Sequence, residues 1–489
     1  MKLSELYLGF NDGITEATEE KFTDYFYDHN KMIEKVLKKN IWLVLGRKGT
    51  GKSLLGRYLE EIKDNWNDFS ILLSYQDFRL NKLVPLKSGD ESPNQYIQIW
   101  KWLLLIEISR LLLQSNELME EQDYYRLGAF FNKNFGDLQI DKNKILEITK
   151  NGKIKGEVGL AGLKIGGEIG KDIKYIEANY SEYLYDLEET VSRLLKKTKL
   201  NYLIMLDGLD HRFKRVNDYQ DMATGIIYAA KYYNNFFSKN RIKTKILVFM
   251  RSDIFNWLND PDLNKVKLDN TYEINWGEDT TFESPLFDLI IKKVKTSIPN
   301  DKICDLERGK MLNILFPSDE KMTNPEYILT KTLLRPRDLI TFLNLAKKYY
   351  PKETAFTPIV IRAVTNKYSE YFHGEFRNEL SGHLKQKKID KSFDFISKFA
   401  RTEFNLQDAL DFNVANYSDT ERLDLRDIFS TLFDFSILGN SYFEQVENKV
   451  IRRWAHLEYN FGISKIEFDI SIIVHPGLYS FLKLSKDKP

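Results

Sequence analysis

The sequence contains a glycine-rich loop whose residue types and spacing suit the binding of phosphate. Residues 46–53 read Gly-Arg-Lys-Gly-Thr-Gly-Lys-Ser, which is glycine, four residues and then Gly-Lys-Ser. Glycines let successive backbone N–H groups curl around an anion, and a helix that begins at the loop adds the partial positive charge of its N-terminus. We expect Lys52 to reach the β- and γ-phosphates of a nucleotide and Ser53 to offer its hydroxyl group to magnesium. The expected nucleotide contacts along this loop are Gly46, Lys48, Gly49, Thr50, Gly51, Lys52, Ser53 and Leu54.

The flanking residues make this reading more specific than the motif alone. Residues 41–45 form a continuous apolar run, which is typical of a parallel strand buried on both faces. Residues 53–62 have apolar side chains at helical spacing. The alternative is a glycine-rich turn that happens to end in Lys-Ser, and the strand before it and the helix after it disfavour that alternative.

A carboxylate stands where another apolar run ends. Residues 202–207 read Tyr-Leu-Ile-Met-Leu-Asp, and ligands of such sheets bind beyond the carboxyl ends of the strands. We therefore expect Asp207 to act on the magnesium side of the site, as a direct ligand or through another ligand; the alternative is a turn or helix-capping aspartate. Asp210, three residues later, either polarises an attacking water molecule or is an ordinary turn carboxylate.

Three arginines are further candidates for contact with phosphate. Arg251 follows the apolar run 246–250, where its charge could stabilise phosphate during transfer, or it could pair with a nearby aspartate. Arg335 and Arg337 precede the apolar helix expected over 339–346. Each could reach the nucleotide from a helical lid, and each could equally form a salt bridge between domains.

The order of these elements predicts an α/β fold with a doubly wound sheet. Helical stretches, notably 219–234, separate the apolar runs, which favours a mainly parallel five-stranded sheet with extra strands between the loop strand and the carboxylate strand. The five expected strands are 41–45, 69–75, 202–207, 246–250 and 271–276.

Other segments are placed around this core, which we expect to span residues 41–300. Residues 1–40 form an N-terminal helical segment, with a helix over 19–39. Residues 77–180 form an inserted region with an amphipathic helix at 100–113, and its glycine-rich stretch 152–170 favours a β-hairpin over a second phosphate site. Residues 301–350 form a helical lid.

The last part, residues 351–489, is expected to be a helical, winged-helix-like module. Leu438-Gly439-Asn440 indicates a turn after the helices. Residues 466–472 alternate apolar and polar side chains, which predicts a strand.

The charge balance, the cysteine count and the apolar runs limit the classes of function that the sequence supports. In 489 residues there are 72 Lys and Arg against 71 Asp and Glu, so the net charge does not support constitutive binding of nucleic acid, although a local basic face would still permit it. The one cysteine, Cys304, excludes an internal disulfide framework and a multi-cysteine zinc site. No export signal and no bilayer-spanning apolar run is apparent, so we expect a cytoplasmic protein with no membrane partner.

Taken together, four motifs resemble those of the STAND and KAP group of P-loop ATPases, over roughly residues 5–350. The chain is most similar to bacterial P-loop ATPases encoded near anti-phage defence genes. The motifs are the loop at 46–53, Asp207-Gly208-Leu209-Asp210, Met250-Arg251-Ser252-Asp253 and Arg335-Pro336-Arg337-Asp338.

The resemblance implies a P-loop NTPase core with a helical lid and a winged-helix region, acting as a switch that uses ATP and Mg2+. It also implies control of homo-oligomer assembly or of a partner effector. His211 stands where that group often has a second acidic residue, which favours slow hydrolysis. The alternatives are an ATPase that remodels DNA or RNA and, less favoured for a chain of this size, a small-molecule kinase.

Overall fold

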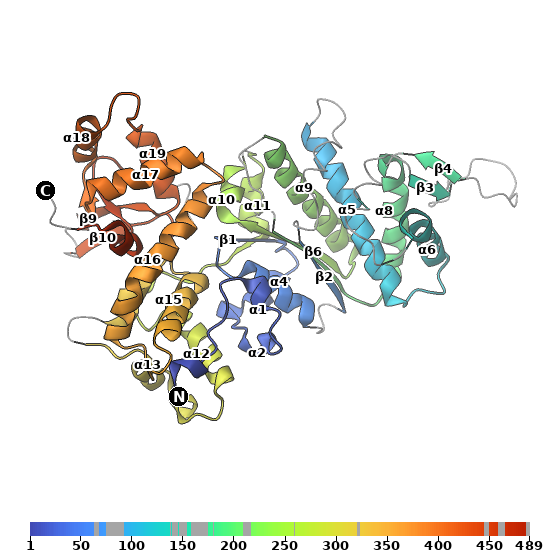
Figure 1. Cartoon of the computed structure of the whole chain (residues 1–489). Coiled ribbons are helices and arrows are strands. Elements are labelled where there is room, and N and C mark those ends of the chain that lie inside the picture. Colours follow the sequence, from blue (N-terminus) through green and yellow to red (C-terminus); the bar gives the residue numbers. More distant parts are fainter. Residues whose placement is uncertain are drawn as a thin grey trace, which may run out of the picture. The chain divides into compact units, whose positions relative to one another are not determined.

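The computed structural model describes residues 1–62, 68–74, 92–136, 138, 145, 154–157, 175–178, 180–208, 217–258, 260–319, 323–444, 449–457 and 465–485. Its elements are shown in Figure 1. The chain forms two compact units. The first consists of residues 1–29, 49–51 and 275–489, and the second of residues 30–48 and 52–274.

The second unit is built on a five-stranded sheet in which every strand is parallel to its neighbours. All five strands expected from apolar runs are present, in the order β2-β5-β6-β1-β7. The strand β6 therefore lies between the loop strand β1 and the carboxylate strand β5, as expected. The strands are β1 (Leu43–Gly46), β2 (Phe69–Ser74), β5 (Tyr202–Asp207), β6 (Thr244–Arg251) and β7 (Thr271–Glu273).

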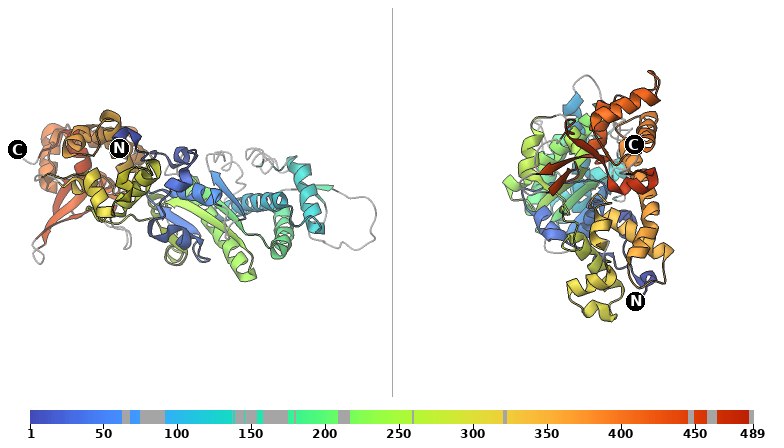
Figure 2. Two further views of the ribbon diagram at one scale, coloured as in Figure 1. Left: turned by 90° about the horizontal axis from the view of Figure 1, so that it is seen from below. Right: turned by 90° about the vertical axis from the view of Figure 1, so that its left-hand side faces the viewer.

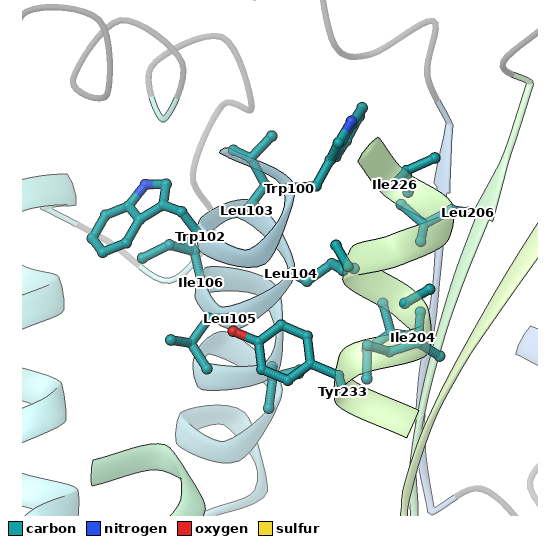
Figure 3. Close-up of a cluster of buried hydrophobic side chains, with 14 of the residues drawn as sticks. Trp100, Trp102, Leu103, Leu104, Leu105, Ile106, Ile204, Leu206, Ile226 and Tyr233 are labelled. Carbon is teal, nitrogen blue, oxygen red and sulfur yellow. The ribbon is translucent and has the colours of Figure 1, made fainter. Parts of the chain in front are cut away.

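Helices cover both faces of this sheet. On one face, α5 (Ser92–Ser115) and α9 (Asn217–Asn240) bury their side chains against Ile204 and Leu206 of β5 (Figure 3). On the other face, α4 (Lys52–Glu61) approaches so closely that a Cβ on Gly56 would lie 3.0 Å from Leu72. Burial on both faces explains why the strands are continuous apolar runs.

Among the described residues, the inserted region and the segment that follows it form the helices α5, α6 (Gln122–Phe135) and α8 (Tyr180–Lys197) and a pair of strands. These helices pack together, with the pair of strands beside α6 (Figures 1 and 2). β3 (Ile154–Glu157) and β4 (Tyr175–Ala178) are antiparallel, so one strand lies in the expected stretch 152–170 and its partner lies after that stretch. The rest of the expected stretch, residues 152–153 and 158–170, lies outside the described residues.

The helix expected at 100–113 is present as part of α5, but the expectation that it is amphipathic was wrong. Nearly every side chain from Trp100 to Leu113 is buried, on several sides of α5. The helix lies between the sheet face with α9 on one side and α6 with α8 on the other, so it needs apolar residues around most of its circumference.

The single helix expected over residues 19–39 was also wrong. The segment forms α2 (Phe22–Tyr25), the 3-10 turn η2 (His29–Lys31) and α3 (Met32–Leu37). Asn30 and Lys31 have φ angles of 54° and 53°, so the backbone is left-handed there and a helix cannot continue. Before them lie the short elements η1 (Leu3–Glu5) and α1 (Gly13–Glu16).

The first unit is largely helical from residue 285 to residue 380, which includes the segment 301–350 that was expected to be helical. Pro325, Pro336 and Pro358 each stand in the first turn of a helix, where the missing N–H costs nothing. The helices are α12 (Pro285–Ser297), α13 (Arg308–Leu315), α14 (Asn324–Leu329), α15 (Pro336–Tyr349) and α16 (Pro358–Leu380).

The C-terminal part adds helices and a four-stranded sheet in the order β10-β9-β11-β8. Along the described residues of this part, from 386 to 474, a helix and a strand are followed by two helices and then three strands. These elements are α17 (Gln386–Phe399), β8 (Glu403–Phe404), α18 (Leu406–Asn416), α19 (Leu425–Asp434), β9 (Leu438–Glu444), β10 (Lys449–Arg453) and β11 (Ser471–Val474).

Two expectations for this part were wrong. The predicted turn at 438–440 is the start of β9, where Gly439 gives room to Trp454, because a Cβ there would lie 2.5 Å from the indole ring. The strand predicted over 466–472 begins only at Ser471. The side chain of Asn440 accepts a hydrogen bond from the N–H of Glu467 at 2.9 Å and donates one to its carbonyl oxygen at 2.8 Å. These bonds satisfy the backbone groups that a neighbouring strand would otherwise bond.

Among the described helices, none combines the length and the apolar character needed to cross a membrane.

Candidate functional site

The glycine loop connects β1 to α4 in a conformation that depends on its glycines. Gly49 and Gly51 have φ angles of +85° and +99°, a region that L-residues with side chains rarely adopt. The loop therefore turns sharply between the end of β1 at Gly46 and the start of α4 at Lys52. This is the strand, loop and helix arrangement that the sequence predicted.

Lys52 ties the two ends of the loop together. Its ammonium group donates hydrogen bonds to the carbonyl oxygens of Gly46 at 2.7 Å and Arg47 at 3.0 Å. The charge of Lys52 is thus held across the start of the loop. Ser53 and Leu54 lie in the first turn of α4 and are half-buried, as is Lys48, whereas Thr50 is buried.

Three of the expected site residues end neighbouring parallel strands. Gly46 ends β1, Arg251 ends β6 and Asp207 ends β5, and these strands are consecutive in the sheet. Because the strands are parallel, their carboxyl ends lie at the same edge, where ligands of such sheets bind. The structure therefore brings these three positions to one edge, while Asp210 lies outside the described residues.

Arg251 is engaged by a neighbouring carboxylate. Its guanidinium group makes two hydrogen bonds to Asp253, from Nε to Oδ1 at 2.9 Å and from Nη2 to Oδ2 at 2.6 Å. This is the local ion pair that the sequence left open as an alternative. Contact of Arg251 with phosphate remains a prediction.

The two lid arginines have different surroundings. Arg335 is 2% exposed, and its guanidinium group bonds Asp338 in α15 and Glu379 in α16. Burial alone would lower its pKa, but these two carboxylates hold the pKa well above its ordinary value. Arg335 therefore forms salt bridges that brace one helix against the next within one compact unit, rather than a bridge between the two units.

Arg337 lies against the glycine loop instead. Its backbone nitrogen is 3.4 Å from the carbonyl oxygen of Gly49, and a Cβ on Gly49 would lie 3.0 Å from the Cβ of Arg337. The guanidinium group donates to the carbonyl oxygen of Asn11 at 2.7 Å and lies 3.6 Å from Glu375. Of the two lid arginines, Arg337 is the stronger candidate for nucleotide contact.

Two polar contacts at this site were missed by the sequence analysis. Glu273 ends β7, next to β1, and accepts a hydrogen bond from the hydroxyl group of Ser252 at 2.7 Å. The strand expected over 271–276 placed Glu273 in its middle, so the sequence did not mark this residue as the end of a strand. Trp276 donates from its indole N–H to the carbonyl oxygen of Thr50 at 3.0 Å, and no local pattern in the sequence indicates this contact.

Ser53 and Asp207 are the residues that the sequence analysis named for a metal, and both carry oxygen atoms. In the part of the chain that the structure describes, no three His, Cys, Asp or Glu side chains gather as a metal cage. Magnesium is usually bound through one or two protein oxygens together with substrate phosphates. A hydroxyl group from Ser53 and a carboxylate from Asp207 are oxygen donors of that kind.

Comparison with known proteins bears on one segment of the chain. Residues 284–377 match the model of the FunZ-associated C-terminal helical domain. The match runs from the start of α12 to near the end of α16, and it includes Arg335 and Arg337 but not the glycine loop. No curated protein matches the chain.

Proposed function

We propose that the chain is a P-loop NTPase, a slow ATP-hydrolysing switch that controls assembly or a partner effector in bacterial anti-phage defence. The observation that carries the proposal is the glycine loop, which has two left-handed glycines and joins a buried parallel strand to a helix. Its N–H groups and the N-terminus of α4 are suited to hold phosphate.

Each remaining residue has a defined place in this proposal. Lys52 and the loop amides bind the triphosphate, while Ser53 and Asp207 hold magnesium. Bound magnesium would neutralise charge on the phosphates during hydrolysis. Arg337 contacts the nucleotide beside the loop tip. Arg251 releases its hydrogen bonds to Asp253, binds the transferred phosphate instead and stabilises its charge.

Two observations support a switch rather than a rapid motor. Arg251 is held by two hydrogen bonds to Asp253, so an exchange of partners precedes its action on phosphate. The chain also has large additional parts beyond the sheet, including the matched helical domain, which is compatible with a protein of a defence locus. The strand and helix order of residues 386–474 supports a winged-helix-like module as the place of output.

The decisive test is nucleotide binding by the Lys52→Ala variant. Loss of a charge-assisted bond to phosphate should weaken binding of magnesium-ATP by at least about tenfold. Nucleotide-dependent thermal stabilisation measures this. The control is Lys387→Ala, which removes an exposed lysine from the first turn of another helix, α17. Equal stabilisation of both variants, or none in the wild type, would refute the proposal.

Asp207→Asn separates binding from hydrolysis. The amide keeps the shape of the side chain but lacks the charge that favours magnesium. The variant should therefore still bind ATP through the loop amides and Lys52 while its magnesium-dependent turnover falls. Unchanged turnover would leave Asp207 as a structural residue at the end of β5.

A further inference from the structure

Two consecutive carbonyl groups at the tip of the glycine loop are held from outside the loop. The carbonyl of Gly49 accepts from the backbone N–H of Arg337 at 3.4 Å, and the carbonyl of Thr50 accepts from the indole N–H of Trp276 at 3.0 Å. Residues 49–51 belong to the same compact unit as both donors. These contacts therefore act within one unit.

Holding a carbonyl also sets the direction of the next N–H group. A peptide group is planar and trans, so the C=O of one residue and the N–H of the next point in opposite directions. With the carbonyls of Gly49 and Thr50 turned toward their donors, the N–H groups of Thr50 and Gly51 point away from those donors. A loop that binds phosphate needs its N–H groups fixed in advance, because ordering them on binding would cost affinity.

Trp276, the donor to Thr50, is supported by the N-terminal segment. Trp276 is 4% exposed and stacks on the ring of His29, with ring centres 4.6 Å apart and planes inclined by 15°. Tyr27 lies beside the same indole at 6.2 Å. His29 in turn contacts the carbonyl oxygen of Asn275 through Nε2 at 2.9 Å. The indole is thereby oriented by residues that precede the first strand.

Arg337, the donor to Gly49, is also supported by the N-terminal segment. Its Nε donates to the carbonyl oxygen of Asn11 at 2.7 Å, and the side chain of Asn11 accepts from the hydroxyl group of Thr341 at 2.7 Å. Farther along α15, Asn344 donates to the carbonyl oxygen of Gly9 at 2.9 Å. Residues 9–11 thus run along the helix that carries Arg337.

We infer that the N-terminal segment, residues 1–29, sets the phosphate affinity of the glycine loop through two positioning residues, Trp276 and Arg337. One route runs from His29 through Trp276 to Thr50, and the other from Asn11 through Arg337 to Gly49. The inference rests on the proposed function of the loop. It adds that the N-terminal segment fixes the tip of the loop at residues 49–51, which belong to the same compact unit, although it supplies no residue of the loop.

The test compares two buried tryptophans that make the same kind of bond. Trp276→Phe keeps an aromatic ring but removes the N–H that holds Thr50. Trp100→Phe removes an indole bond to the carbonyl oxygen of Met222, also 3.0 Å long and buried, in the inserted region. Both variants should lose similar thermal stability without nucleotide. Only Trp276→Phe should bind magnesium-ATP more weakly, by about five- to tenfold, the worth of one hydrogen bond.

The kinetic readout and a second pair of variants separate positioning from general destabilisation. Trp276→Phe should raise KM more than it lowers kcat, because the variant disorders the loop that binds the nucleotide and so weakens binding of the ground state. His29→Ala should weaken ATP binding in the same direction, whereas His29→Phe, which keeps a ring to stack on Trp276, should bind more tightly than His29→Ala. This pair tests the route even if Trp276→Phe fails to fold.

The outcomes distinguish the inference from the proposed function. If the wild type binds ATP and Lys52→Ala does not, but Trp276→Phe binds as well as Trp100→Phe, the inference is overturned and the loop assignment stands. The same holds if His29→Ala and His29→Phe bind alike. If the wild type itself binds no ATP, both the proposed function and the inference fall.

Discussion

Gly46 and Arg251 are direct neighbours across the parallel strands β1 and β6. The first residue of the glycine loop therefore lies beside the last residue of the strand that separates it from Asp207. Because both residues belong to the sheet, their spacing is set by strand pairing rather than by a mobile connection. A residue at position 251 is therefore held beside the loop of its own chain.

Replacing Arg251 should lower turnover at every protein concentration. Removal of a charge that stabilises the transferred phosphate costs about a hundredfold in kcat, and a residue of the same chain needs no assembly to act. Steady-state hydrolysis of Arg251→Ala over a range of protein concentrations measures this. The control is Arg193→Ala, since Arg193 makes a similar two-bonded pair with Asp123 in the inserted region. Equal rates for the two variants would leave Arg251 as a structural partner of Asp253.

Arg337 should act on the nucleotide of its own chain. Its backbone N–H already lies at Gly49 of the same chain, so no neighbouring subunit is needed to bring it there. We expect that mixing inactive Arg337→Ala with inactive Lys52→Ala restores no hydrolysis. A mixture of wild type with Lys52→Ala gives the reference rate. Recovery in the first mixture would show an arginine supplied by another subunit and contradict this prediction.

Gly49→Ala should destabilise the protein more than Gly51→Ala. Both glycines have positive φ angles, so each alanine costs about 1–2 kcal/mol in backbone strain. A Cβ on Gly49 would also lie 3.0 Å from the Cβ of Arg337, whereas a Cβ on Gly51 meets no described atom within 4 Å. The crowding adds about 1–3 kcal/mol. Thermal melting without nucleotide compares the variants, and equal melting temperatures would exclude the tight contact.

The buried His475 should make stability depend on pH in the acid range. Burial, followed by the charge of Lys331, lowers its pKa from 6.5 to about 3. The unfolded chain therefore binds more protons than the folded chain between these values, and stability falls as pH drops from about 6.5 toward 3. One proton changes the free energy of unfolding by at most about 1.4 kcal/mol per pH unit.

The His475→Asn variant tests this dependence of stability on pH, because it removes the titrating ring but keeps a hydrogen-bond acceptor for Gly477. The ring nitrogen Nδ1 of His475 accepts the N–H of Gly477 at 3.1 Å, and an asparagine oxygen can replace it. The variant should be less stable than the wild type at pH 7, because it loses ring packing, but its stability should change less between pH 6.5 and 4. Parallel pH profiles from urea unfolding would contradict the assignment.

Much of the core could be predicted from local sequence. The glycine loop, the strand before it and the helix after it are recognisable because glycine spacing and apolar runs occur within a few residues of each other. All five strands were found for the same reason, since a strand buried on both faces is apolar throughout. The prediction of a helix over 19–39 was wrong because the spacing of apolar residues does not reveal the left-handed backbone at Asn30 and Lys31.

The sequence by itself determined which residues could hold phosphate and magnesium, because that chemistry lies in one loop and in the residue that ends a strand. Only the tertiary structure decided what surrounds them. It assigned Arg335 to a buried ion-pair cluster and Arg337 to the loop, although both stand in one short motif. The contact between Arg337 and Asn11 joins residues 326 positions apart, and that between Trp276 and Thr50 joins residues 226 apart. Periodicity and motif spacing report only on near neighbours in the chain, so such contacts are defined by folding.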